Sequence, residues 1–222
     1  MKIIITESQY NLIIEREDEK NVMEMNAIYR LFIAKFNARD FHQSSNGYET
    51  AISMKLNTDF GDLLLNFTNE KHADRGHYIW NTNGRLPMIS IYNCDFVFEG
   101  KRVVNIRKFN SQVLKHEMVH FIDDKKDRKL TKSRTGLSRD RWNNDPFEIN
   151  AEFLSVMDRI PKRKPDYVLP DTFEQFLKSY KGFSLTTFHQ FENMDEKKRK
   201  ALIGRLYQYY THLRDKLQNP ST

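Results

Sequence analysis

The segment His116-Glu117-Met118-Val119-His120 decides how this sequence is interpreted, because it places two histidines and a glutamate within one predicted helix. Histidines four residues apart project from the same face of a helix, with their Cβ atoms about 5–6 Å apart. Two imidazoles at that spacing can both reach one Zn²⁺ ion, whose bonds to histidine nitrogen are about 2.0–2.1 Å long. The glutamate between them lies where it can take a proton from metal-bound water. The segment therefore predicts a zinc site with Glu117 as its general base.

The composition is typical of a folded globular protein. The chain has 222 residues, of which 39% are hydrophobic and 30% are charged, and its 16 Phe and 10 Tyr supply material for a core. Its single cysteine, Cys94, excludes an internal disulfide and a cysteine-rich zinc cluster, and we expect a buried or inert thiol. The sequence shows neither an 18-residue apolar stretch nor a signal-peptide core. We therefore expect no membrane partner and a cytoplasmic location.

Local patterns predict an α+β fold around the motif. Asn110 or Ser111 caps a helix that runs to about Asp123 and carries the motif. Strands are expected upstream, and the last two of them form a hairpin across Gly100. The predicted strands cover residues 2–5, 51–56, 78–80, 86–92, 95–99 and 102–107, the predicted loop covers 37–47, and further helices cover 20–36, 60–67, 171–180 and 195–217. The result is a small mixed or antiparallel sheet packed on the motif helix, followed by a helical C-terminal region.

A catalytic zinc site usually takes three protein ligands, so the motif leaves one ligand to be found. Asp145-Pro146-Phe147-Glu148 predicts a helix start, with Asp at the N-cap, Pro at N1 and Glu at N3. Glu148 is the first choice for the third ligand. Glu152, one turn later on the same face, would hold the other ring nitrogen of a motif histidine. A glutamate at N3 also suits a capped helix without metal, and the alternative ligands are Asp123, Asp124, Asp145 and His189.

His116-Glu117-x-x-His120, followed after 27 residues by Glu148-Ile149-Asn150-Ala151-Glu152, resembles the gluzincin arrangement of HExxH metallopeptidases. In that family a downstream helix carries a glutamate ligand and, four residues later, an acid in contact with a ligand histidine. The run Phe147–Phe153 also resembles ExxA segments of small bacterial and phage peptidases. The opening residues 1–7 resemble small proteins of large tailed phages. The gluzincin resemblance covers about residues 110–155, and Glu152 stands where the family usually has aspartate.

The resemblance implies a zincin-like fold and a zinc metalloendopeptidase that cleaves a protein or peptide. A Zn²⁺ ion on His116, His120 and Glu148 would lower the pKa of its water towards about 7, and Glu117 would carry that proton to the leaving amine. The family also implies a substrate-binding edge strand beside the motif helix, for which residues 86–92 are the candidate. The candidates for stabilising the oxyanion are Tyr92, Arg141, Tyr167 and His189.

The predicted domain division places the peptidase domain at residues 1–160. A helical extension at 161–222 would pack on the same core. For a phage-encoded enzyme the expected location is the host cytoplasm or the virion.

A second feature, the basic segment 125–141, keeps other functions open. It carries eight lysines and arginines and two aspartates, so its own net charge is +6. This equals the net charge of the whole chain. Such a loop could meet an acidic partner or nucleic acid, although charge runs are most often solvated surface. The alternatives to a peptidase are therefore a catalytically silent zincin-fold structural or virion-associated protein and a nucleic-acid-binding protein. Glu117 favours the peptidase, because a scaffold needs no general base.

Overall fold

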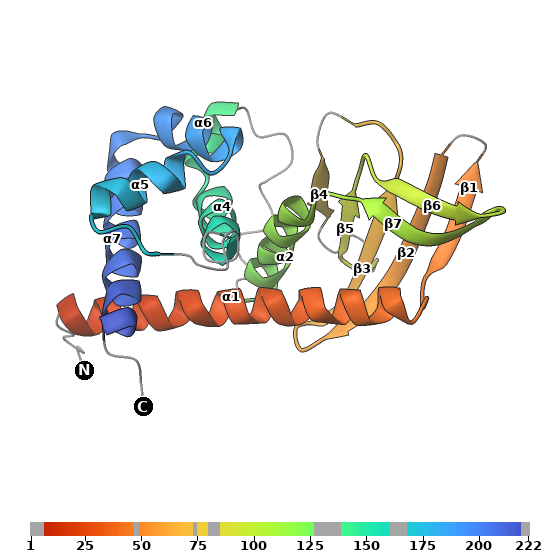
Figure 1. Ribbon diagram of the computed structural model, residues 1–222, viewed down its shortest axis with the longest axis horizontal. Helices are drawn as coiled ribbons and strands as arrows, with labels where there is room; N and C mark the ends of the chain where they lie inside the picture. Colours follow the sequence, from red (N-terminus) through yellow and green to blue (C-terminus); the bar gives the residue numbers. More distant parts are fainter. Residues whose placement is uncertain are drawn as a thin grey trace. The chain divides into compact units, whose positions relative to one another are not determined.

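The computed structural model describes residues 7–46, 49–72, 75–79, 85–126, 139–159 and 168–218. These residues form an α+β fold, as predicted, with a five-stranded mixed sheet, a two-stranded hairpin and seven helices (Figure 1). The chain divides into two units. We call residues 23–134 the sheet unit, and residues 1–22 with 135–222 the helical unit. The long helix α1 (Glu7–Asn37) contributes to both.

The strands of the sheet unit are ordered β1-β2-β3-β5-β4. All neighbours are antiparallel except β3 and β5, which are parallel. The register places Met54 opposite Leu65 and Leu65 opposite Ile89, and all three side chains are buried. Alternation along each strand therefore builds one apolar face. The strands are β1 (His42–Asn46), β2 (Glu49–Thr58), β3 (Gly61–Thr68), β4 (Gly76–Ile79) and β5 (Met88–Ile91).

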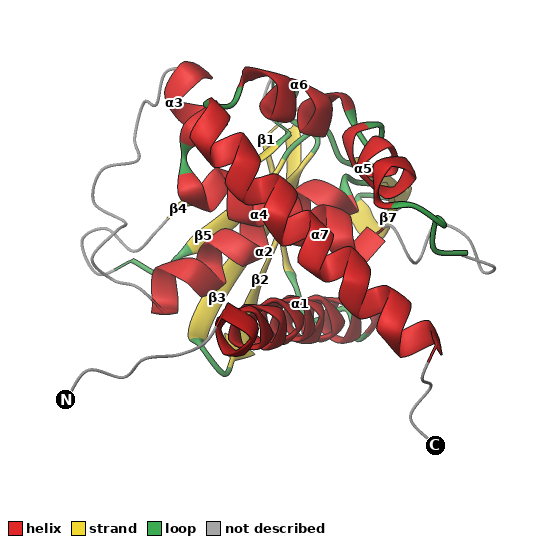
Figure 2. Cartoon of the chain, turned by 90° about the vertical axis from the view of Figure 1, so that its left-hand side faces the viewer, coloured by secondary structure: helices red, strands yellow, loops and turns green. Residues whose placement is uncertain are grey.

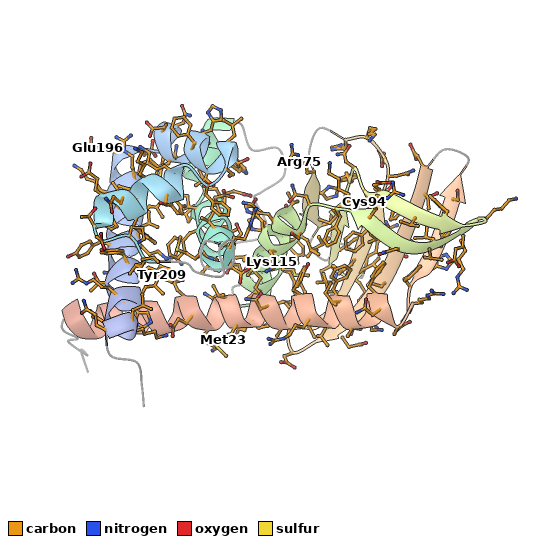
Figure 3. The ribbon with its side chains drawn as sticks, in the orientation of Figure 1. Met23, Arg75, Cys94, Lys115, Glu196 and Tyr209 are labelled. Atoms are coloured by element: carbon orange, nitrogen blue, oxygen red, sulfur yellow. The ribbon has the colours of Figure 1, made fainter. Side chains whose placement is uncertain are left out.

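Two helices supply the rest of this core. Phe32 of α1 is buried and stacks on Phe67 of β3, with ring centroids 5.1 Å apart. Helix α2 (Ser111–Lys126) lies beside β4 and β5 (Figure 1). Its buried Lys115 contacts α1, with Nζ 3.3 Å from Asn26 Oδ1 and 4.8 Å from the centre of the Tyr29 ring (Figure 3). The motif helix is thus fixed against both the sheet and α1.

The predicted hairpin is present as β6 (Asp95–Glu99) and β7 (Arg102–Lys108). Gly100 in its turn has a φ of 61°, which glycine adopts at little cost. The Gln43 side chain joins this hairpin to β1, because its amide donates to the Lys101 carbonyl at 2.8 Å and accepts from the Val103 N–H at 2.7 Å.

The helical unit contains the five C-terminal helices (Figure 2). Arg205 links three of its segments: it pairs with Asp18 of α1, donates to Asn150 at 2.9 Å and lies 3.9 Å from the centre of the Phe153 ring. The helix that carries Glu148 therefore shares a unit with the C-terminal helices. The predicted domain division at residue 160 stays a prediction. The helices are α3 (Arg139–Asn144), α4 (Pro146–Arg159), α5 (Phe173–Lys181), α6 (Leu185–Asn193) and α7 (Glu196–Gln218).

Three local predictions are wrong. The predicted helix 60–67 is wrong, because residues 61–67 belong to strand β3, in which Leu63, Leu65 and Phe67 are buried. Short apolar runs fit either structure, and pairing with β2 decides for the strand. Residues 37–47, predicted as a loop, include β1. Its sequence HQSSN is polar throughout and lacks the apolar alternation that indicates a strand. Residues 86–92 do not form an edge, because β5 pairs on both sides and β4 lies outside it as the last strand at that end of the sheet. The predicted strand 2–5 lies outside the described residues.

Candidate metal centre

Helix α2 presents the two motif histidines as a converging pair. Asn110 caps the helix as predicted, since its Oδ1 accepts from the N–H groups of Gln112 at 3.2 Å and Val113 at 3.1 Å. The Nε2 atoms of His116 and His120 lie 3.1 Å apart, and their rings are nearly perpendicular at 85°. A tetrahedral Zn²⁺ ion holds two nitrogen ligands about 3.3 Å apart. The histidine pair therefore fits one zinc ion with an adjustment of a few tenths of an ångström.

The surroundings of the pair are largely closed to solvent. His120 is 5% exposed and Glu117 is 8% exposed, while His116 is half-buried. The neighbouring Met118 and Phe121 are fully buried. Charges interact more strongly where water is excluded, so a dication bound here would act strongly on the Glu117 carboxylate.

Two of the alternative third ligands have other partners. Asp124 Oδ2 accepts a hydrogen bond from the Tyr78 hydroxyl of β4 at 2.7 Å. Burial raises the pKa of Tyr78 well above its ordinary value, and the adjacent Asp124 carboxylate raises it further. Asp145 is the N-cap of α4, where its Oδ1 accepts from the Phe147 N–H at 2.8 Å. Both carboxylates therefore have structural roles that need no metal.

Glu148 lies in the first turn of α4, directly after the predicted Asp145 cap and Pro146. Its side chain is half-buried. His116, His120 and Glu148 together form a group that could hold a metal ion, each offering one ligand atom. The structure thus supports a possible metal site with the three ligands predicted from the sequence.

Glu152 is buried within the helical unit, with 3% exposure. Its carboxylate accepts a hydrogen bond from the Thr187 hydroxyl of α6, and Thr187 Oγ1 lies 2.8 Å from Ser184 Oγ. This partner was not predicted, because α6 itself was not expected from the sequence. The predicted contact of Glu152 with a motif histidine stays a prediction.

The remaining candidate residues whose side chains are described lie in the sheet unit and on α6. Tyr92 stacks on His72, with centroids 4.6 Å apart, and lies 5.3 Å from His77. His189 is exposed on α6. The thiol of Cys94 is buried, as predicted, and burial raises its pKa to about 12, which disfavours the thiolate that a nucleophile requires. The Arg141 side chain, Tyr167 and residues 127–138 of the basic segment lie outside the described residues.

Comparisons of the chain with protein-family models, with curated proteins and with solved structures find no match. The gluzincin resemblance therefore stays an expectation. Within the part of the chain that the structure describes, none of the helices has the length and apolar character needed to cross a membrane.

Proposed function

We propose that this protein is a zinc-dependent metallopeptidase with His116, His120 and Glu148 as metal ligands and Glu117 as general base. The observation that carries the proposal is the 3.1 Å separation of the histidine Nε2 atoms on α2. Two histidines and a glutamate are a donor set that catalytic zinc takes in peptidases, with one position left for water. Glu148 adds the carboxylate that completes this set.

The residues would divide the reaction between them. A zinc ion in this position supplies Lewis-acid activation of water and of the substrate carbonyl. Glu117 takes the proton of the attacking water and delivers it to the amine of the leaving peptide. Glu117 follows His116 directly in α2 and is almost buried, which favours a carboxylate held near the ligand pair. Glu152 would orient a ligand histidine through the second ring nitrogen.

Substrate alignment is assigned to β4 in place of the predicted residues 86–92. Within the described residues β4 pairs only with β5, and it lies beside α2. An extended peptide can add to such an edge through main-chain hydrogen bonds. A peptide held on β4 would run along the helix that carries the histidines and Glu117.

Glu117→Gln is the variant that tests this function, because glutamine keeps the size of the side chain but cannot accept the proton. The measurement is cleavage of a fluorogenic peptide library by the zinc-loaded protein, with zinc content determined on the same samples. We expect unchanged zinc and a loss of cleavage of at least about 100-fold, the usual contribution of a general base. Cleavage that persists in Glu117→Gln contradicts the assigned role, and wild-type protein that binds zinc but cleaves nothing supports a catalytically silent scaffold.

A further inference from the structure

The edge strand β4 is attached to α2 near both ends of that helix. At one end, a Cβ on Gly76 would lie 2.5 Å from Val113 Cγ1 in the first turn of α2, so only glycine allows this close approach. At the other end, the Tyr78 hydroxyl donates to Asp124 in the last turns of α2. Val113 and Asp124 are separated by about 16 Å of helix, at about 1.5 Å per residue. The strand therefore lies along the helix.

The Tyr78 contact also falls on the face of α2 that carries the histidines. His116, His120 and Asp124 are spaced by four residues, so each lies one turn further along nearly the same stripe. Side chains alternate along a strand, which sends Tyr78 to the α2 side of β4 and His77 to the other side. The centre of the His77 ring lies 5.3 Å from that of Tyr92, the residue that follows β5. The Tyr78–Asp124 hydrogen bond thus joins β4 to the stripe of α2 that carries His116 and His120.

The Tyr78–Asp124 hydrogen bond keeps its donor at neutral pH. Tyr78 is half-buried, and its ring meets Phe121 at 6.2 Å. Burial and the Asp124 carboxylate both raise the pKa of Tyr78, so the hydroxyl stays protonated and continues to donate. A hydrogen bond to a carboxylate is stronger than one between neutral groups.

We propose that Tyr78 and Asp124 are positioning residues that hold β4 against the histidine face of α2 and so fix where a peptide paired with β4 lies. The proposal rests on the proposed peptidase function. Neither residue takes part in bond breaking, and the ligand set and Glu117 stay intact without them. Their loss weakens the binding of the extended substrate while leaving the chemical step unchanged, which places the effect in KM.

The test compares the full-length wild type with Tyr78→Phe and Asp124→Asn. Zinc-loaded proteins are assayed on β-casein, an unfolded protein substrate, and deuterium exchange is followed in peptides that contain residues 75–79. For Tyr78→Phe we expect unchanged zinc content and a kcat within about twofold of wild type. KM should rise about tenfold and deuterium exchange at residues 75–79 should be about tenfold faster, because the variant loses one hydrogen bond to a charged group. Asp124→Asn keeps an acceptor oxygen and should show a smaller, about threefold, effect.

Tyr210→Phe is the matched control. It removes a tyrosine hydroxyl that donates to the carbonyls of Pro170 at 2.9 Å and Asp171 at 2.8 Å within the helical unit. Its KM and its exchange at residues 75–79 should equal those of wild type. Wild-type values in Tyr78→Phe, or an equal loss in Tyr210→Phe, overturn the proposal. If wild type binds no zinc, the proposed function fails, and the exchange measurement still decides whether Tyr78 holds β4.

Discussion

The hydroxyl of Thr187 on α6 donates a hydrogen bond to the buried carboxylate of Glu152 on α4. If Glu152 holds a ligand histidine as proposed, the hydrogen bond from Thr187 fixes the orientation of the Glu152 carboxylate. Thr187→Val keeps the shape of the side chain and removes the donor. We expect its zinc dissociation constant to rise about three- to tenfold, somewhat less than the loss seen when a direct partner of a ligand is removed. Competition with a fluorescent chelator measures this constant.

Thr186→Val is the control for this prediction, because Thr186 is the exposed neighbour on the same helix. Its zinc affinity should equal that of wild type. An unchanged zinc affinity in Thr187→Val, with the fold intact by circular dichroism, contradicts the role given to the Thr187–Glu152 pair.

Gly76 should tolerate no side chain. In Gly76→Ala the new Cβ would meet Val113 Cγ1 at 2.5 Å, and both Ile91 Cδ1 and the Ser90 carbonyl at 3.0 Å. We expect the free energy of unfolding to fall by about 1–3 kcal/mol, as is usual for overpacking. Gly204→Ala in α7 meets nothing within 4 Å and should raise it by about 0.5–1 kcal/mol. Urea unfolding of both variants measures the difference, and equal effects of the two changes would argue against the close packing of β4 on α2.

Arg205 should be the most important charged residue of the helical unit. It pairs with the largely buried Asp18 and contacts Asn150 and the Phe153 ring. Arg205→Ala leaves the aspartate without its cation, and we expect a loss of about 2–4 kcal/mol in the free energy of unfolding. Lys200→Ala breaks the exposed ion pair with Glu196 and should cost about 0.5 kcal/mol or less. Thermal or urea unfolding that shows similar losses for both variants would refute this ranking.

The pH dependence of stability should include a contribution from Glu19. Burial raises the pKa of Glu19, but hydrogen bonds from Lys216 and His212 together outweigh it, and the pKa lies below its ordinary value in the folded chain. A lowered folded-state pKa stabilises the protein above the unfolded-state pKa, and this gain is lost as pH falls through the folded-state value. Glu19→Gln should therefore be less stable than wild type at pH 7, by less than about 1 kcal/mol because the site is partly exposed. The two proteins should converge in urea titrations at acid pH, and a constant difference would exclude Glu19 as the titrating group.

Those parts of the fold that depend on neighbouring residues could be predicted from the sequence. Asn110 caps α2 and Asp145 caps α4, and both helices were predicted close to their observed bounds because a cap acts within three residues. The β6–β7 hairpin was also predicted from neighbouring residues, because the turn at Gly100 joins its two strands directly. The three proposed ligands follow from spacing on these two helices.

The remaining features depend on contacts between distant residues. The run Leu63-Leu64-Leu65 fits a helix or a strand, and its pairing with β2 makes it a strand. Nothing local shows that β5 is inserted between β3 and β4. The Tyr78–Asp124 and Thr187–Glu152 hydrogen bonds join residues 46 and 35 positions apart, so no sequence window contains both partners.

The most direct test of the metal centre is the zinc content of the purified full-length protein, measured by elemental mass spectrometry without added zinc or chelator. His120→Ala, which removes one of the two nitrogens that lie 3.1 Å apart, is measured beside it. We predict about one zinc per wild-type chain and little or none in the variant, since a catalytic site holds its ion through three protein ligands. A wild-type chain that carries no zinc and takes none up when zinc is added would contradict the central claim that His116, His120 and Glu148 form a metal site.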